Sequence, residues 1–146
     1  MSHPRPDLDL NDHCACGAAS MAVTGPVLSM LLCSCLDCQK ATGTGHSAVA
    51  LVPASALSVK GAHKSYARTA DSGAIFTRHF CSECGTPLYG ESSRAATLRM
   101  IPVGFFAGAS DWFAPAQLIF ARSQQGWDLV ADHLPRHDTY RSGGQP

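Results

Sequence analysis

The seven cysteines of this sequence fall into three short clusters, and cysteine thiolates are ligands that zinc prefers in proteins. Two thiolates that lie one to four residues apart can reach the same ion from a tight turn. A glycine follows the first and the third cluster, where it permits the backbone conformation that such a turn requires. The first cluster is Cys14 and Cys16, the middle cluster is Cys33, Cys35 and Cys38, and the third cluster is Cys81 and Cys84. This spacing predicts metal binding.

Counting the ligands divides the three clusters into two sites of different kinds. The first and third clusters together supply four thiolates, which is the number that a closed structural zinc site needs. Such a site would tie the start of the domain to its middle and stabilise a fold with a small core. The middle cluster supplies three thiolates and leaves one position open, the pattern of a catalytic or ligand-binding zinc. Zinc in an open site lowers the pKa of the water or external thiol that it binds.

Four other roles remain open for these cysteines. They are burial without a metal, a thiol–disulfide couple at Cys35/Cys38 or Cys81/Cys84, an iron–sulfur cluster, and a closed second zinc site with His46 or another residue as its fourth ligand. The spacings fit no common ferredoxin pattern, and neither pair follows the strand-then-helix order of thioredoxin-like motifs. The strongest rival is therefore the closed second site.

Composition bounds the architecture that positions these clusters. The 146 residues suit one domain, and 45% of them are hydrophobic, which is enough for a core. Only 15% are charged, and 13 glycines and 9 prolines favour short strands and turns over long surface helices. The formal net charge of zero argues against binding to nucleic acid, which requires clustered positive charge. The longest apolar stretch, residues 27–32, is far shorter than the ~20 residues that span a bilayer.

The elements expected from the sequence are mostly strands. Strands are predicted over residues 27–33, 46–52, 64–69, 74–80 and 96–101, and short helical turns over 37–42 and 53–57. A single domain is expected over residues 12–140, with a disordered arm over 1–11 and a flexible tail over 141–146. The start of the chain lacks the pattern of a secretory signal, and clustered reduced cysteines are typical of the cytoplasm, so a cytoplasmic protein is predicted.

Three motifs together resemble a known family. They are Cys14-Ala-Cys16-Gly17, Cys33-Ser-Cys35-Leu-Asp-Cys38 and Arg78-His-Phe80-Cys81-Ser-Glu-Cys84-Gly85, in this order. Over about residues 12–130 the chain resembles the glutathione-dependent formaldehyde-activating enzyme family, also called the CENP-V/GFA domain. Two positions depart from the family pattern: Gln39 stands where an arginine is common, and Leu57 where an aromatic residue is frequent.

The resemblance implies a fold and an activity. The implied fold is the β-tent, a mostly β architecture of small antiparallel sheets with short helical turns, held by zinc. The implied sites are a closed zinc on the first and third clusters and a catalytic zinc on the middle cluster, in agreement with the ligand count. The implied activity is the condensation of glutathione with formaldehyde to S-hydroxymethylglutathione, a carbon–sulfur lyase reaction. The alternatives are a related lyase that acts on another thiol–aldehyde adduct and a non-catalytic zinc-stabilised module that binds a protein or a small thiol.

Residues near the clusters supply candidates for the other roles. His46 is a candidate general acid for the alkoxide that forms when a thiolate attacks the aldehyde, and its alternative role is that of a hydrogen-bonded strand histidine. Lys40 is a candidate to balance the thiolate charge or to bind a carboxylate of glutathione; it is otherwise an exposed helical lysine. Arg78 is expected to pair with an acid, Glu83 or Glu91.

Two further groups of residues have weaker candidate roles. His13 and His79 lie near ligand cysteines in the sequence and are candidates to hydrogen-bond the sulfur atoms. The aromatic residues of the second half either line a pocket or form plain core, with the core the more common outcome. They are Phe105, Phe106, Trp112, Phe113 and Phe120.

Overall fold

Strands and short helical turns account for most of the ordered elements in the computed structural model, which describes residues 5–141. The strands are β1 (Asp7–His13), β2 (Ala19–Pro26), β3 (Ser29–Cys33), β4 (Ser47–Pro53), β5 (Leu57–Gly61), β6 (His63–Thr69), β7 (Ile75–Cys81), β8 (Pro87–Ser92), β9 (Leu98–Pro102) and β10 (Leu118–Ile119). The helical elements are α1 (Leu36–Thr42) and the 3-10 turns η1 (Ala54–Ala56), η2 (Ser93–Ala95), η3 (Val103–Ala109) and η4 (Ala121–Ser123). Within the described residues, no helix is both long and apolar enough to cross a membrane.

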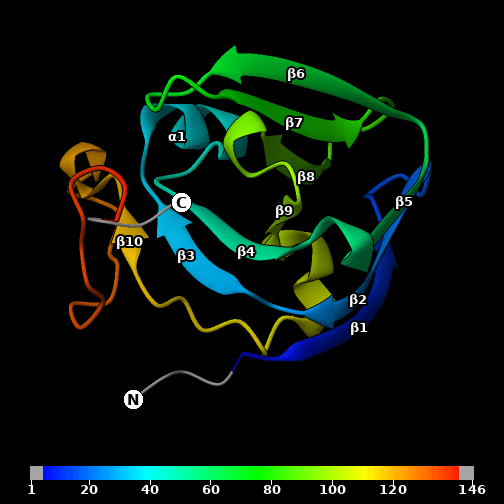
Figure 1. The fold of residues 1–146 in the computed structure, drawn as a ribbon, viewed down its shortest axis with the longest axis horizontal. Helices are drawn as coiled ribbons and strands as arrows, with labels where there is room; N and C mark the ends of the chain where they lie inside the picture. The colour runs from blue at the N-terminus through cyan, green and yellow to red at the C-terminus, as the bar shows by residue number, and fades with distance from the viewer. Residues whose placement is uncertain (1–4, 142–146) are drawn as a thin grey trace.

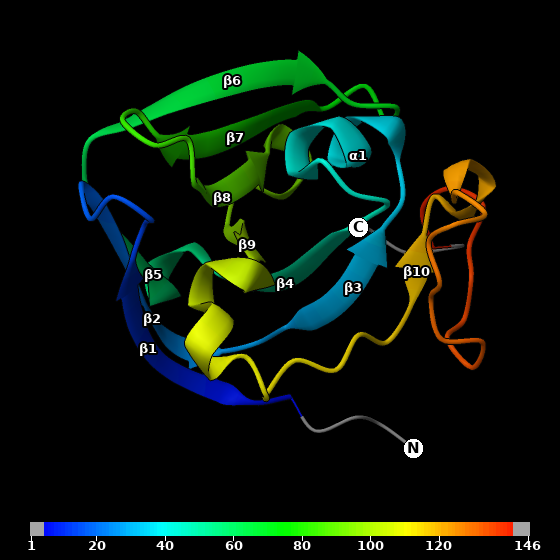
Figure 2. The ribbon, with the colours of Figure 1, turned by 180° about the vertical axis from the view of Figure 1, so that it is seen from behind.

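The strands form two sheets of unequal size. The small sheet is antiparallel, in the order β1-β2-β5, and the large sheet has seven strands in the order β10-β3-β4-β9-β8-β7-β6. Every pairing in the large sheet is antiparallel except that of β10 with β3. Figures 1 and 2, taken from opposite sides, show the large sheet bending from β3 and β4 to the β6–β7 hairpin, with α1 beside that hairpin. The bend turns one face of the sheet inward.

The strand register decides which side chains share this inward face. Residues paired across neighbouring strands lie on the same face of a sheet. Cys33 pairs with Ser47, and Leu31 pairs with Val49. Further along the sheet, a continuous row runs from Leu51 through Met100, Gly90 and Arg78 to Tyr66. Side chains from both ends of the large sheet therefore face the same interior space.

The core has one main cluster between the sheets and smaller ones at the edge of β3. Fully buried side chains of the main cluster include Val23 from β2, Val52 from β4 and Ile101 from β9. A second cluster packs around Cys33 and contains buried leucine, isoleucine and phenylalanine side chains. The large sheet therefore packs against the small sheet on one side of the bend and surrounds the middle cysteine cluster on the other.

The predicted mostly β architecture with short helical turns is confirmed. The strands expected over 27–33, 46–52, 64–69, 74–80 and 96–101 correspond to β3, β4, β6, β7 and β9, with ends that differ by up to two residues. The helical turns expected over 37–42 and 53–57 correspond to α1 and η1. The sheet order, and with it the seven-stranded bend, was not predicted.

One expectation about the ends of the domain is wrong. Residues 7–11, predicted to belong to a disordered arm, form most of β1 and pair in register with β2. Leucines alternate with polar residues in this segment, so one face of the strand is apolar. On that face Leu8 is buried and Leu10 packs against the main core cluster, which holds the segment in place. Residues 1–4 of the expected arm and 142–146 of the expected tail lie outside the described residues.

Candidate metal centres and the adjoining cavity

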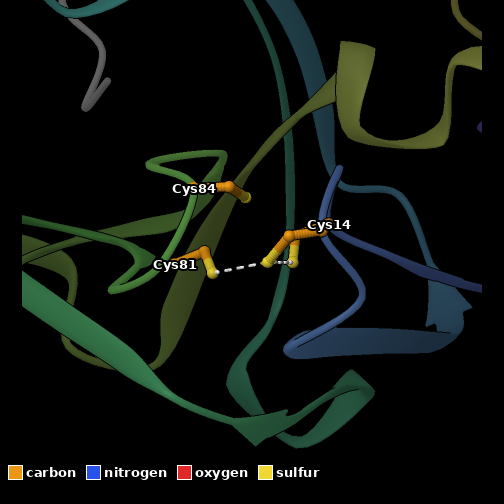
Figure 3. Close-up of side chains that lie close together, drawn as sticks. Cys14, Cys81 and Cys84 are labelled. Carbon is orange, nitrogen blue, oxygen red and sulfur yellow. Dashed lines mark hydrogen bonds between the residues drawn. The ribbon is translucent and has the colours of Figure 1, made fainter.

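The first and third cysteine clusters meet although they come from different sheets. Cys14 and Cys16 lie in the turn after β1. Cys81 ends β7 and Cys84 follows in the turn before β8, and Figure 3 shows these two on one side and Cys14 on the other. The four sulfur atoms all lie within 4.8 Å of one another. The Cys14 and Cys16 sulfurs are 3.7 Å apart, and those of Cys16 and Cys81 are 3.8 Å apart. A zinc tetrahedron with Zn–S bonds of ~2.3 Å has edges of about 3.8 Å. These sulfur atoms therefore fit one tetrahedral ion.

Hydrogen-bond donors surround these sulfurs as ionised thiolates require. The backbone N–H of Ala19 donates to the Cys14 sulfur at 3.3 Å, and that of Glu83 donates to the Cys81 sulfur at 3.4 Å. Hydrogen bonds from the Thr86 side chain and backbone lower the pKa of Cys84 to about 5. The glycines that close the two turns, at positions 17 and 85, have φ values of 83° and 78° in the left-handed region. A hydrogen bond with the Ala18 backbone lowers the pKa of Cys16, but burial and hydrogen bonds with the three neighbouring cysteines raise it more, to about 12, so without a metal the four thiols are ionised unequally.

The middle cluster lies at the join between β3 and α1. Cys33 ends β3, Cys35 is the N-cap residue of α1, and Cys38 lies in its first turn. Their sulfurs lie within 4.8 Å of one another, and within the described residues no histidine, aspartate or glutamate joins the group. The backbone N–H of Cys38 donates to the Cys35 sulfur at 3.3 Å. The arrangement is three converging thiols without a fourth protein ligand, so the alternative of a site closed by His46 is not supported.

The three thiols share charge unequally. Hydrogen bonds from Cys33 and Cys38 lower the pKa of Cys35 to about 2. The same thiol–thiolate hydrogen bonds, together with burial, raise the pKa of Cys33 far above its ordinary value. A hydrogen bond with Cys33 lowers the pKa of Cys38, but the neighbouring Cys35 thiolate and burial raise it more, to about 11. Without a metal, the cluster therefore carries one thiolate and two thiols at neutral pH.

Two buried serine hydroxyls lie close to the middle cluster in the sequence or in the strand register. The hydroxyl oxygens of Ser34 and Ser47 are buried, and neither has a hydrogen-bond partner within the described part of the chain. Ser34 lies between two ligand cysteines, and Ser47 is opposite Cys33 in the strand register, where it lowers the pKa of Cys38. A buried hydroxyl without an acceptor destabilises a fold by about 1–3 kcal/mol. The donor set itself suits zinc, because three cysteine sulfurs that lie within 4.8 Å of one another can share one tetrahedral ion.

A cavity of about 350 Å³ opens beside the middle cluster. It is lined by all three cysteines of that cluster and by the inward face of the large sheet. Its apolar wall consists of residues from β3, β4, β7, β9 and the segment after β10. They are Leu31, Val49, Leu51, Phe76, Met100 and Phe120. A ligand in this cavity would therefore contact both the thiols and a hydrocarbon surface.

Charged side chains lie at the rim of the cavity. Arg68 of β6 forms an ion pair with Asp37 of α1 at 3.1 Å, and its guanidinium lies 5.0 Å from the centre of the Phe76 ring. The charge of Arg68 also contributes to the lowered pKa of Cys35, after the thiol hydrogen bonds. Arg78 lines the cavity and lies over the Tyr66 ring at 5.4 Å. Among residues 5–141, no carboxylate lies within 4 Å of the Arg78 guanidinium, which leaves it available to an anionic ligand.

Several sequence-predicted residues lie elsewhere. Lys40 is exposed in the last turn of α1 and does not line the cavity. His46 does not line it either, and its Nδ1 lies 2.7 Å from a carboxylate oxygen of Asp128. This placement favours the alternative of a hydrogen-bonded histidine. The expected pairing of Arg78 with an acid is wrong, because Glu91 instead contacts His79 at 3.2 Å and Arg99 at 3.3 Å.

The remaining candidates have structural surroundings. His13 donates from Nδ1 to the carbonyl oxygen of Cys14, 2.8 Å away, rather than to a sulfur atom. Of the aromatic candidates, Phe120 alone lines the cavity, while the others belong to the main core cluster or pack against it. Sequence reasoning missed Arg68 as a charged neighbour of the thiols, because it lies 30 positions after Cys38 and only the β6–β7 hairpin brings it to α1.

Gln39, one of the two departures from the family pattern, has a definite role. Its side-chain amide donates to the carbonyl oxygens of Ser34 at 2.8 Å and Ser123 at 2.9 Å. Its Oε1 accepts a hydrogen bond from the Gln125 side chain at 3.0 Å. The amide thus joins the loop of the middle cluster to the segment around η4.

Comparisons with known proteins agree with this arrangement. The family model described as "Glutathione-dependent formaldehyde-activating enzyme" matches residues 9–123. A relative from Emericella nidulans is 41% identical over 78 residues, which are 53% of this chain and 39% of the relative. One from Fusarium vanettenii is 30% identical over 122 residues, 79% of this chain and 64% of the relative. Both are named as candidate glutathione-dependent formaldehyde-activating enzymes, and the chain spans only part of their length.

A solved structure shows the same fold. A crystal structure of a Rhodobacter sphaeroides protein superimposes with a TM-score of 0.56 at 18% identity, covering 70% of this chain and 92% of that one. At this identity the likeness concerns the fold alone.

Proposed function

The chain belongs to the glutathione-dependent formaldehyde-activating enzyme family, and from that premise we propose that it is a zinc-dependent carbon–sulfur lyase. It forms or cleaves an adduct between a thiol and an aldehyde, of which S-hydroxymethylglutathione is the simplest. The observation that carries the proposal is the middle cluster, where three thiols converge beside a cavity and no fourth ligand is found among residues 5–141. A site that served only to hold the fold together would be closed, like the four-cysteine set.

The two cysteine sets have separate tasks in this proposal. Cys14, Cys16, Cys81 and Cys84 hold a structural zinc that joins the small sheet to the large sheet. The middle cluster holds the second zinc, which supplies a Lewis acid that lowers the pKa of an incoming thiol. Ser47 lowers the pKa of Cys38 from outside the ligand set, and Arg68 balances part of the negative charge that three thiolates bring.

The residues of the cavity bind and orient the two substrates. Arg78, which has no acid partner in the described chain, binds a carboxylate of glutathione at the rim. The thiol then points inward toward the middle cluster, and the apolar wall excludes water from the aldehyde. In the forward direction, the bond between sulfur and the aldehyde carbon forms, and the carbonyl oxygen receives the proton that the thiol loses. His46 as the general acid stays a prediction.

The cellular setting follows from the same chemistry. Three converging thiols hold zinc only in the reduced state, so we place the protein in a reducing compartment and propose the cytoplasm. Glutathione is the abundant thiol that the family name implies as co-substrate.

The rate of exchange between free glutathione and S-hydroxymethylglutathione, measured by NMR, tests the proposal. Zinc-loaded protein should accelerate the exchange in the presence of formaldehyde, and Cys35→Ser should lose at least a hundredfold of that acceleration. Arg78→Ala should raise KM for glutathione roughly tenfold or more, because a charge-assisted hydrogen bond contributes about 1.5–3 kcal/mol. Lys60→Ala, an exposed change on the small sheet, is the matched control. An acceleration that survives Cys35→Ser unchanged would remove the middle cluster from the reaction and favour a non-catalytic binding module.

A further inference from the structure

The cavity is much larger than formaldehyde requires. Its volume is about 350 Å³, which lies in the range of sites that bind small organic ligands, roughly 300–1,000 Å³. Formaldehyde has two heavy atoms and is close in size to water, whose share of liquid volume is about 30 Å³. Glutathione takes part of this volume, so the chemical character of the wall, and not the volume alone, has to identify the second substrate.

The deep wall of the cavity is hydrocarbon, whereas its charges lie at the rim. The buried cluster around Cys33 contains Leu31, Leu51 and Phe120 from the wall, and Val49 and Met100 pack against it. At the rim, by contrast, the Asp37 side chain is 53% exposed and its partner Arg68 is partly exposed. The charged ends of a glutathione molecule match the rim, and the deep wall matches an apolar group.

Gly90 leaves room for an aromatic ring on the inward face of the large sheet. Gly90 pairs with Arg78 on one side and with Met100 on the other, so it lies on the inward face between them. A Cβ at this position would come within 2.6 Å of the Phe76 ring. The absence of a side chain therefore allows the Phe76 ring to lie across the inward face. The cavity is consequently lined by an aromatic ring as well as by aliphatic side chains.

We propose that the aldehyde partner of this protein carries a hydrocarbon chain of several carbons, and that this chain lies against Leu31, Val49, Leu51 and Met100. This inference rests on the proposed function and names the class of its second substrate. The step is the same addition: the sulfur–carbon bond forms, the carbonyl becomes a hydroxyl, and the thiol proton moves to the oxygen, with no oxidant or reductant. The adduct carbon then becomes a stereocentre, and a cavity with unlike walls favours one configuration.

A series of unbranched aldehydes tests the inference on the unmodified protein. Propanal, butanal, pentanal and hexanal differ in chain length but have similar carbonyl reactivity, and formaldehyde is run in parallel. The measurement is kcat/KM for adduct formation with glutathione, together with the ratio of the two adduct diastereomers by NMR. Burial of one methylene changes an equilibrium by up to about fourfold. We therefore expect kcat/KM to rise at least tenfold from propanal to hexanal, with one diastereomer formed in excess.

Two variants localise the effect. Val49→Phe fills the wall and should lower the hexanal-to-propanal ratio of kcat/KM at least fivefold, whereas Val59→Phe, on the small sheet and away from the cavity, should leave that ratio unchanged. A ratio near one in the unmodified protein, with formaldehyde still turned over, would overturn the inference and leave the proposed function standing. The absence of zinc-dependent acceleration with every aldehyde, formaldehyde included, would refute both. The unmodified series decides the matter even where Val49→Phe does not fold.

Discussion

The four-cysteine set should stabilise the domain by linking segments that are far apart in the chain. Cys16 and Cys81 are 65 positions apart, and their sulfurs are 3.8 Å apart. If one metal cross-link closes a loop of this length, the chain-entropy relation gives a stabilisation of about 4 kcal/mol. The perturbation that removes it with least collateral damage is Cys16→Ser combined with Cys84→Ser, because both side chains are exposed and their replacement leaves no cavity. Two ligands remain, which are too few to hold the ion.

Thermal unfolding followed by circular dichroism measures this loss. For a domain of this size, 1 kcal/mol corresponds to roughly 3 °C in Tm, so the double variant should unfold roughly 10–15 °C below the unmodified protein. The matched control is Cys35→Ser in the middle cluster, whose ligands all lie in the short segment from Cys33 to Cys38. That change closes no long loop and should shift Tm by less than half as much.

The zinc content, measured by mass spectrometry of the folded proteins, completes the test. The double variant should lose one zinc per chain and keep the other. Equal Tm shifts for the double variant and for Cys35→Ser would show that no long-range cross-link exists, and the assignment of a structural role to the first and third clusters would be wrong.

Three further predictions concern the surroundings of the middle cluster. Gln39→Ala removes three hydrogen bonds and should lower the free energy of unfolding by about 2–3 kcal/mol in a urea titration. The control Gln124→Ala removes one side-chain hydrogen bond and should lower it by about 1 kcal/mol. Equal losses would contradict the linking role of Gln39. Ser47→Ala should weaken zinc binding at the middle cluster by about 10–100-fold in a competition with a chelator while the structural zinc stays bound, and an unchanged affinity would show that this hydroxyl does not support the ligands. Zinc binding at the middle cluster should release two protons at neutral pH. The raised pKa values of Cys33 and Cys38 keep these two thiols protonated, whereas the lowered pKa of Cys35 leaves it ionised. The apparent affinity for zinc should therefore rise about a hundredfold per pH unit. Calorimetry in buffers of different ionisation enthalpy counts these protons, and a value near zero or three would contradict the charge distribution.

The grouping of the cysteines into a set of four and a set of three was predictable from sequence, because the spacing within each cluster is a local property. A turn that presents two thiolates needs only the residues of that turn, and the number of ligands in each cluster divided the set of four from the set of three. The strands with long apolar runs, such as β4, were predictable for the same reason. By contrast, β1 begins Asp-Leu-Asp-Leu, and its many polar residues led to the prediction of a disordered arm, although the segment is a strand in which Leu8 is buried.

The cavity was not predictable, because it depends on the order of the strands. Arg78 and Met100 lie on one inward face only through their shared neighbour Gly90, and Arg68 reaches Asp37 only through the β6–β7 hairpin. Nothing in a single sequence specifies these pairings.

Two residues that are close to the middle cluster in the sequence do not line its cavity in the structure. Lys40 follows Cys38 by two positions in a helix, a rotation of about 200° that directs it away from the sulfur atoms. His46 precedes Ser47 at the start of β4, and neighbouring residues at a strand point in opposite directions, so Ser47 rather than His46 faces the cluster.

The most direct test of the central claim, that the middle cluster is an open zinc site for a thiol substrate, is a calorimetric titration of glutathione into zinc-loaded protein. The unmodified protein should bind one glutathione per chain, and zinc-treated Cys35→Ser should show no binding while its structural zinc and fold remain. Absence of binding in both proteins, or equal binding in both, would contradict the claim.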